Sequence, residues 1–387
     1  MGRARSRGLD RDQLPRGRGS GGCEIVREVR RTGRGPDRDR RELDCQEHLG
    51  TLSTRLEENE ESVIRTPFTE MFEIEHPVVS AGMGGGGTSG ELVGHVSEAG
   101  GLGVIGASFV PPQEFEGMVT RAREITSKPI GINLLLHAAE DRLDDVLRAG
   151  PAVLSTAWPR DDQDLRAIFG KAHERGIRVM HMVPKVEDAL RAAEAGADVI
   201  VAQGNEGGGH IGEIGTTVIV RQVVKAVAPT PVLASGGFVD GAGLAAALAL
   251  GADGVLLGTR FLATEEAPVE AAYKRAIVAS DGGDTIVTTV ADTLTGRDWP
   301  GAWARVRRTR FIEEWLGREP ELRRRRQAVW AILETAEASD PDYGLMWFGQ
   351  SAGLVDSIIP AGEVVRQIVE EAEEILRTRL PRVLSPD

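Results

Sequence analysis

The stretch D-V-I-V-A-Q-G-N-E-G-G-G-H-I-G, from Asp198 to Gly212, joins a buried strand to a glycine-rich loop. Its first part is a continuous apolar run, Val199 to Ala202, as expected for a strand covered on both faces. Glycine in the loop lets the backbone approach a ligand closely, and α/β enzymes place their chemistry in loops that follow parallel strands. The stretch therefore predicts a parallel sheet with a functional site that includes His210. A solvated surface loop is the alternative.

The same strand-then-helix unit is repeated along residues 78–279. The strand segments are continuous runs of Val, Ile, Leu and Ala, and many helical segments end in Ala-Gly or Arg-Gly, which is a helix C-cap signal. Eight consecutive units predict an α/β fold of the (β/α)8 TIM-barrel class, and a doubly wound open sheet is the alternative. The predicted strands are 78–79, 102–107, 130–136, 153–157, 178–183, 199–202, 231–235 and 254–257. The predicted helices are 91–100, 112–126, 139–149, 161–175, 186–195, 217–227, 243–250 and 271–279.

The two ends of the chain do not follow this pattern, which predicts three segments. Residues 1–61 are rich in Arg and Gly and poor in large apolar residues, so we expect a disordered arm. A basic arm for nucleic acid and a misassigned start codon are the alternatives. The barrel is expected over 62–282. Residues 283–387 are expected to form a mainly helical extension that packs on the barrel, with a strand over 284–290, helices from Trp303 onward and a long amphipathic helix over 361–379. Its Trp, Met and Phe side chains are expected in a hydrophobic core.

Composition excludes several classes of function. The chain has 387 residues and a net charge of −13, which argues against nucleic acid as a partner. Its two cysteines, Cys23 and Cys45, lie in the first 50 residues, so the rest of the chain offers no thiolate nucleophile and no Cys-ligated metal site; we expect no metal. No apolar run approaches 18 residues, and the N-terminus has no apolar signal core. We therefore expect a cytoplasmic protein without membrane association. The sequence does not predict the oligomeric state.

Two turns at the predicted strand ends suggest a phosphate site. In TIM barrels the loops after the seventh and eighth strands commonly bind phosphate. Here these loops contain Gly236-Gly237 and Leu256-Leu257-Gly258-Thr259. Backbone N–H groups in such turns can bind an anion, and the Thr259 hydroxyl adds a donor. A tight turn explains any single glycine, but two such loops at these positions favour a phosphorylated cofactor.

Polar and sulfur-containing side chains at other strand ends fit a flavin ring. Asn133 and Gln203 carry amides that both donate and accept, as the edge of the flavin pyrimidine ring requires. Gly82 and Met83 follow the first predicted strand and would place backbone and a thioether against the ring.

The chain resembles the nitronate monooxygenases, formerly called 2-nitropropane dioxygenases, which are FMN-dependent (β/α)8 enzymes. The resemblance covers roughly residues 65–370, and it departs from the family pattern at two glycines. Gly82 stands in Ala-Gly-Met where the family has Ala-Pro-Met, and Gly207 replaces an alanine in the histidine loop. The matching stretches are H-P-V-V-S-A-G-M (76–83), S-E-A-G-G-L-G-V-I-G-A (97–107), G-I-N-L (131–134), G-A-D-V-I-V-A-Q-G-N-E-G-G-G-H-I-G (196–212), P-V-L-A-S-G-G-F (231–238), G-A-D-G-V-L-L-G-T-R-F (251–261), D-T-I-V-T (284–288) and G-Q-S-A-G-L (349–354).

The resemblance implies an FMN site and a catalytic histidine. His210 matches the family's active-site histidine, and Asn133 and Met83 match positions beside the isoalloxazine. Together with the reasoning on strand ends, this gives the predicted cofactor-binding residues: Gly82, Met83, Asn133, Gln203, Gly208, Gly209, Gly236, Gly237, Leu256, Leu257, Gly258 and Thr259.

The predicted reaction is the FMN-dependent oxidation of alkyl nitronates with O2, with neutral nitroalkanes as a second substrate class. His210 would hydrogen-bond the nitro oxygens or remove the α-proton of a neutral nitroalkane. Glu206 is an alternative base, with a loop-bracing role at least as compatible, and His137 is a minor candidate. Two other functions stay open. One is an NAD(P)H-dependent FMN reductase acting on enoyl thioesters or quinones, and the other is a non-catalytic flavin- or phosphate-binding barrel.

Overall fold

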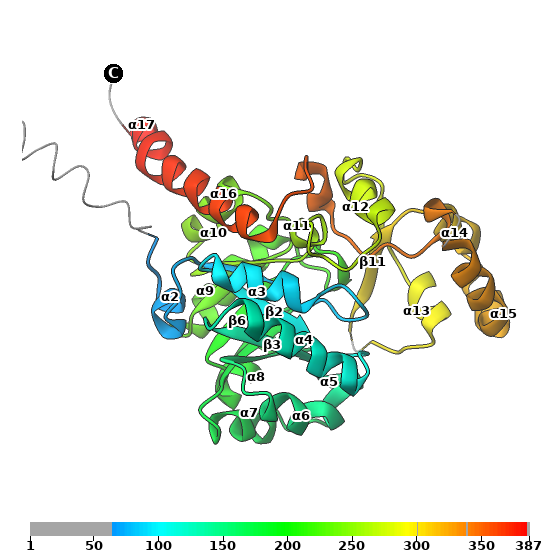
Figure 1. The fold of residues 1–387 in the computed structure, drawn as a ribbon, viewed down its shortest axis with the longest axis horizontal. Coiled ribbons are helices and arrows are strands. Elements are labelled where there is room, and N and C mark those ends of the chain that lie inside the picture. Colours follow the sequence, from blue (N-terminus) through cyan, green and yellow to red (C-terminus); the bar gives the residue numbers. More distant parts are fainter. Residues whose placement is uncertain (1–63, 300, 338–339, 385–387) are drawn as a thin grey trace, which may run out of the picture. The chain divides into compact units, whose positions relative to one another are not determined.

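The computed structural model describes residues 64–299, 301–337 and 340–384, which belong to one compact unit, Ser62–Asp387 (Figure 1). The arm predicted over residues 1–61, with both cysteines, lies outside the described residues.

Eight parallel strands close into a barrel in the order β1-β2-β3-β4-β5-β6-β8-β9, which confirms the predicted TIM barrel and excludes the open sheet. Closure is made by β1 and β9, where Val79 lies opposite Leu256. The barrel strands are β1 (Val78–Ser80), β2 (Leu102–Gly106), β3 (Ile130–Leu135), β4 (Val153–Ala157), β5 (Arg178–Val183), β6 (Val199–Gln203), β8 (Val232–Ser235) and β9 (Gly254–Leu257).

Helices surround the barrel, and alternate residues of each strand face either these helices or the barrel interior. Val201 belongs to the interior cluster, whereas its neighbours Ile200 and Ala202 pack outward. Phe68 and Phe72 of α2 pack into the interior cluster, so the end of the barrel next to α2 is closed by apolar side chains. The barrel helices are α2 (Pro67–Phe72), α3 (Gly90–Glu98), α4 (Pro112–Ile125), α5 (Leu136–Ala139), α6 (Leu143–Arg148), α7 (Leu165–His173), α8 (Val186–Ala195), α9 (Thr216–Val227), α10 (Gly241–Ala249), α11 (Thr259–Leu262) and α12 (Ala271–Val278).

The single continuous helix predicted over 139–149 is wrong, because this part of the chain forms α5, a 3-10 turn (Glu140–Arg142) and α6 instead. Side chains from the loop after β4 occupy carbonyls that a continuous helix would use. Gln163 Nε2 donates to Leu136 O at 2.9 Å, and Arg160 Nη1 donates to His137 O at 3.0 Å. The next helix begins at Leu165 instead of 161, because the Asp164 side chain caps it by accepting from Ala167 N.

The glycine-rich loop after β6 is part of a second, three-stranded sheet. Within it, β7 (Gly209–Ile211) pairs antiparallel with β11 (Trp303–Arg307), and β11 pairs with β10 (Thr285–Thr288). His210 lies directly opposite Ala304. The helix predicted from Trp303 is therefore wrong over these five residues. Ala304 and Val306 pack into one apolar cluster, whereas Arg305 between them donates to Asn205 and Thr285, so successive side chains point to opposite faces as in a strand.

Two strands of this sheet, β10 and β11, belong to the C-terminal extension, which also contains a helical layer with its own core. Here α13 (Val290–Thr295), α14 (Arg310–Trp315) and α15 (Glu319–Glu337) pack together through an apolar cluster that includes Leu294 and Phe311. The 3-10 turns Pro341–Tyr343 and Gln350–Leu354 follow.

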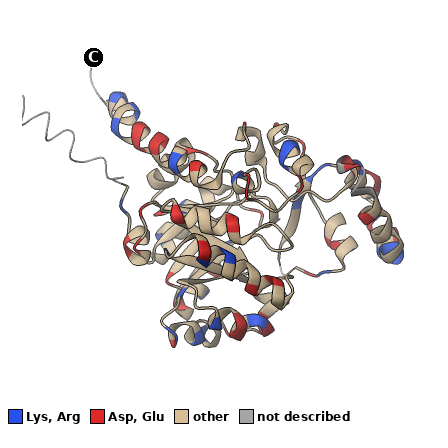
Figure 2. Ribbon diagram, in the orientation of Figure 1, with Lys and Arg blue, Asp and Glu red and all other residues tan. Residues whose placement is uncertain are grey.

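The last long helix, α16 (Ala361–Glu374), packs its apolar face into the main barrel core beside α10 and α3 (Figure 1). It runs through a π-helical turn, Ile375–Arg379, into α17 (Leu380–Leu384), so the helical segment extends past the predicted end at 379. Charged residues of both signs lie on the outer helices (Figure 2). None of the helices in the described ranges has the length and hydropathy that crossing a bilayer requires.

Candidate functional site

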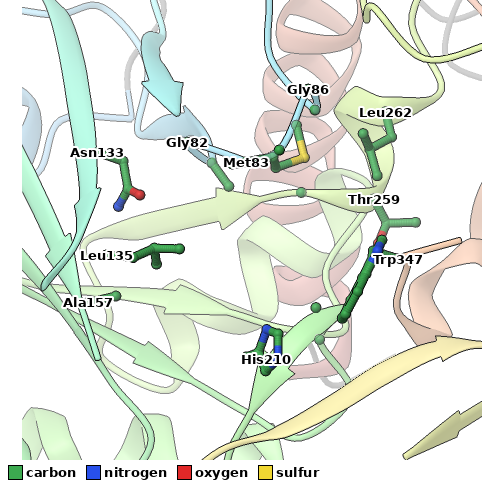
Figure 3. A pocket seen from close by; sticks show the side chains of 18 of the residues that line it. Gly82, Met83, Gly86, Asn133, Leu135, Ala157, His210, Thr259, Leu262 and Trp347 are labelled. Carbon is green, nitrogen blue, oxygen red and sulfur yellow. The ribbon is translucent and has the colours of Figure 1, made fainter. Parts of the chain in front are cut away.

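A cavity of about 760 Å³ lies at the carboxyl ends of the barrel strands (Figure 3). This volume falls in the range of roughly 300–1,000 Å³ that is typical of small-molecule and cofactor sites. The structure brings together on its wall His210 and every residue that the sequence singled out for the cofactor: Gly82, Met83, Asn133, Gln203, Gly208, Gly209, Gly236, Gly237, Leu256, Leu257, Gly258 and Thr259.

The part of the wall near β3 and β6 presents amides to the cavity. Asn133 Nδ2 donates to Ser155 Oγ at 3.1 Å. Gln203 Oε1 is buried and has no hydrogen-bond partner among the described residues, so it is an acceptor that a ligand N–H could satisfy. Gly82 passes so close to Asn133 that a Cβ at position 82 would overlap the Asn133 Cβ. The departure from Ala-Pro-Met thus has a local steric reason.

A second part of the wall is a turn that only glycine forms readily. Gly236 and Gly237 both have φ of +88°, and a Cβ on Gly236 would lie 2.7 Å from Gly204 O. Across from them, Thr259 is the first residue of α11. Its Oγ1 accepts from Gly349 N at 3.0 Å, which leaves the hydroxyl proton available to a ligand oxygen. The arrangement can hold a small anion such as a phosphate group.

His210 stands on β7 and is hydrogen-bonded to Asp292 of α13, with 2.8 Å between Nε2 and Oδ1. Burial lowers the pKa of His210 below its ordinary value of 6.5, and the hydrogen bond to Asp292 raises it only in part. The imidazole is therefore neutral at neutral pH. With Nε2–H donating to the carboxylate, Nδ1 keeps its lone pair. A neutral histidine held in this tautomer can accept a proton at Nδ1.

Aromatic rings surround His210. The Trp299 ring is stacked on the imidazole, with centroids 3.3 Å apart and planes 11° apart, and Trp347 lies 5.3 Å away. Both tryptophans line the cavity. The sequence analysis placed the aromatic residues of this region in a core. Phe348 is fully buried, and Trp347 is partly buried against an apolar cluster while it also lines the cavity. Neither tryptophan has a local sequence signal, because its position depends on where the C-terminal extension packs.

Two strand-end residues on the cavity wall have an uncommon backbone conformation. Phe109 and Trp158 have φ of +66° and +53°. Such conformations in non-glycine residues cost about 1–3 kcal/mol and concentrate at functional sites. The guanidinium carbon of Arg297 lies 3.6 Å from the centroid of the Phe109 ring. The sequence reasoning identified neither Arg297 nor Asp292 as a site residue.

The other proposed acid–base residues have structural surroundings. Glu206 accepts from the backbone N of Thr216 at 2.9 Å and from its hydroxyl, so it braces the loop against α9. His137 packs against the Trp299 ring at 4.3 Å, and burial lowers its pKa to about 4. Its two ring nitrogens have no hydrogen-bond partner among the described residues, and it does not belong to the cavity lining. His210 is therefore the histidine that faces the cavity.

The chain is similar in sequence to several known proteins. The sequence model of the nitronate monooxygenase family matches residues 65–149 and 138–371. A (3aS,4S,5R,7aS)-5-hydroxy-7a-methyl-1-oxo-octahydro-1H-indene-4-carboxyl-CoA dehydrogenase of Mycobacterium tuberculosis is 33% identical over 360 residues, covering 81% of this chain and 98% of the relative. A probable nitronate monooxygenase of Staphylococcus saprophyticus is 30% identical over 365 residues, covering 81% of this chain and 99% of the relative.

Solved structures give the same picture. FabK from Thermotoga maritima superposes with a TM-score of 0.73 at 34% identity, covering 82% of this chain and 99% of FabK. A nitroalkane oxidase from Streptomyces ansochromogenes superposes with a TM-score of 0.70 at 27% identity, covering 82% and 99%. By its sequence and its barrel, the chain belongs to the nitronate monooxygenase family of flavin-dependent oxidoreductases.

Proposed function

We propose that the protein binds FMN in the cavity and oxidises alkyl nitronates, with neutral nitroalkanes as a second substrate class and O2 as the electron acceptor. The observation that carries this proposal is the neutral, Asp292-oriented His210 on the wall of a cavity that also contains every predicted flavin contact. Family membership adds the flavin chemistry, and the nitroalkane oxidase among the similar structures adds the substrate class.

The residues on the cavity wall fit FMN. The unpartnered Gln203 Oε1 and the Asn133 amide would hold the polar edge of the ring, with Gly82 and Met83 beside it. The phosphate would lie against the remaining contacts, which are Gly208, Gly209, Gly236, Gly237, Leu256, Leu257, Gly258 and Thr259. When bound, FMN supplies a two-electron acceptor, so the reaction requires neither a thiol nor a metal from the protein.

His210 is proposed as the base. Its Nδ1 has a free lone pair, because the hydrogen bond to Asp292 is made by Nε2. It would take the α-proton of a neutral nitroalkane, and Asp292 would stabilise the imidazolium that forms. A nitronate has already lost this proton and needs only binding and orientation. The aromatic wall of Trp299 and Trp347 excludes water from this side of the imidazole.

A panel assay tests the proposal. The purified protein should release FMN on denaturation, and it should consume O2 with propane-2-nitronate in the absence of NAD(P)H. A colourless protein that cannot be reconstituted with FMN would contradict the cofactor assignment. A flavoprotein that consumes no O2 with any nitronate or nitroalkane would contradict the substrate assignment.

A second candidate function is the oxidation or reduction of a coenzyme A thioester, including NAD(P)H-dependent reduction. It is favoured by two relatives whose names specify a carboxyl-CoA dehydrogenase, at 33% and 38% identity. Anaerobic addition of NADPH, or of an acyl-CoA, should bleach the flavin rapidly if this candidate is correct. Under the nitronate proposal, only the nitronate or nitroalkane should do so.

A further inference from the structure

Arg297 is the one lysine or arginine among the residues that line the cavity. It lies on the connection between α13 and β11, two residues before the Trp299 that stacks on His210. Within the described part of the chain, its guanidinium forms no ion pair and is placed over the Phe109 ring at 3.6 Å. The connection between α13 and β11 thus places the positive charge of Arg297 on the side of the cavity where His210 lies. Among the described residues, no carboxylate forms an ion pair with this charge.

Stacking on Phe109 determines which atoms of Arg297 remain available. A guanidinium that lies over an aromatic ring uses the face of its plane, whereas its N–H donors point outward within that plane. These donors form a rigid fork that matches two coplanar oxygens on one atom. Phe109 itself is fixed in a left-handed backbone conformation, with φ of +66°, so the platform under the fork is well defined.

The charged groups around Arg297 leave its cation open to an anionic ligand. Burial lowers the pKa of Arg297, with an opposing effect from Asp292, and the group stays a cation at neutral pH. Asp292 is already hydrogen-bonded to His210. Glu114 and Glu334 are the other carboxylates on the cavity wall, and neither is paired with Arg297. Arg297 is an exposed residue of the cavity lining, so its cation is accessible to a ligand that brings a negative charge.

We propose that Arg297 binds an oxyanion of the substrate through its guanidinium fork, and that it thereby selects a small substrate whose reacting end carries two coplanar oxygens. A nitronate and a carboxylate both have this geometry. The inference deepens the proposed function and rests on it for the reaction, but the binding step is independent of turnover. The phosphates of a coenzyme A thioester are a second source of oxyanions, so the test includes them.

The test compares pairs of ligands that differ in charge and little in shape. Binding of butanoate and of butanamide to the FMN-loaded protein is measured from the perturbation of the flavin absorbance, without turnover. Arg297→Gln should weaken butanoate binding by about 10- to 100-fold, the loss expected for charge-assisted hydrogen bonds, and change butanamide binding less than threefold. Arg297→Lys keeps the charge without the fork, so butanoate binding should be intermediate.

The matched control is Arg318→Gln, because Arg318 also stacks on an aromatic ring, Trp315 at 4.7 Å, but does not line the cavity. It should leave the binding of both ligands unchanged. With propane-2-nitronate and 2-nitropropane as substrates, Arg297→Gln should raise KM for the nitronate selectively.

Three results would overturn the inference. The first is an equal effect of Arg297→Gln on butanoate and butanamide, with flavin content and Tm unchanged. The second is butanoate binding by Arg297→Gln that is as tight as that of the wild type. The third is a loss of coenzyme A binding without a loss of butanoate binding, which would assign Arg297 to phosphate. If nitronates are not turned over and Arg297 still governs butanoate binding, then the proposed reaction fails and the oxyanion site stands.

Discussion

The imidazole of His210 has a different neighbour on each side. Asp292 Oδ1 lies 2.8 Å from Nε2 of the imidazole, and the Trp299 ring stacks on one face of it. Only the Nδ1 edge is left for a substrate. The combination would allow the buried His210 to serve as the proposed base, because the carboxylate compensates part of the cost of forming an imidazolium there.

Replacing His210 with Asn should retain FMN, because most of the phosphate-side contacts, Gly236, Gly237 and 256–259, lie outside β7. Turnover of neutral nitroalkanes should fall by about 10²- to 10⁴-fold, the usual contribution of general-base catalysis. Turnover of pre-formed nitronates should fall much less, because they need no base. Steady-state O2 consumption with 2-nitropropane and with propane-2-nitronate measures the two effects. Equal losses with both substrates would show that His210 is not the base.

The Asp292→Asn variant tests the carboxylate separately. Asp292 raises the pKa of His210, so its removal should lower this pKa further. In wild type, the acid limb of kcat/KM for a neutral nitroalkane should lie below pH 6.5, since burial already depresses the pKa. In the variant the limb should move to still lower pH, and the rate at pH 7 should fall because a weaker base remains. The control is Asp298→Asn, an exposed carboxylate in the same segment. A limb that stays in place would contradict the role given to Asp292.

At the scale of elements, the histidine loop is held by the sheet that it joins. Arg305 of β11 is buried and donates from Nε to Asn205 O and from Nη1 to Thr285 Oγ1, both at 3.0 Å. It therefore links the loop after β6 to β10 across the width of the small sheet. The position of His210 depends on this link, although Arg305 lies outside the cavity wall.

We expect Arg305→Lys to loosen the loop, because an ammonium cannot reproduce the two directed hydrogen bonds of the guanidinium. The free energy of unfolding should fall by about 1–3 kcal/mol, and kcat should fall with little change in FMN content. Urea unfolding and single-turnover kinetics measure these quantities. Arg308→Lys, at an exposed neighbouring position, is the control and should behave as wild type. Wild-type kcat in Arg305→Lys would indicate that β11 does not position the histidine.

The elements that sequence reasoning predicted correctly are those with a local cause. The barrel strands are apolar runs, and the helices between them carry caps such as Ser89, whose side chain accepts from Leu92 N. No local sequence signal predicts the strand β7. Its three residues include a glycine and a histidine, and its partner strand lies about 90 residues further along the chain. The residues of the cavity wall fall into the same two groups, those with a local sequence signal and those without one. The barrel-end residues could be predicted, whereas Asp292, Arg297 and Trp299 could not.

At the scale of the whole molecule, the layer between the barrel strands and the surrounding helices contains an ionisable group that links stability to pH. His181 of β5 is 1% exposed and pairs through Nδ1 with the Thr156 hydroxyl at 2.7 Å. Burial lowers its pKa to about 3. In the unfolded chain this histidine has an ordinary pKa near 6.5. Between about pH 3 and pH 6.5 the unfolded chain therefore binds a proton at this position, whereas the folded protein does not. Stability is therefore full above about pH 6.5 and decreases as the pH falls below it.

Between pH 6.5 and pH 5, His181 should reduce the free energy of unfolding by about 2 kcal/mol. Urea unfolding of the FMN-saturated protein at pH 5.0, 6.0 and 7.5 measures the decrease. Because carboxylates titrate in the same direction, the comparison variant is His181→Gln, which should show a shallower decrease. An identical pH dependence in both proteins would mean that His181 does not carry the effect.

The pairing of β7 with β11 also has a consequence for biosynthesis. On the ribosome, all eight barrel strands emerge before Trp303–Arg307 has been translated. A nascent chain can therefore close its barrel and present the glycine turns of a flavin site while the strand that carries His210 still lacks its neighbour. Translation that stops after β9 would leave β7 without its partner strand and the main barrel core without α16. The late position of β11 in the chain thus means that β7, the strand that carries His210, gains its partner only after every barrel strand has been made.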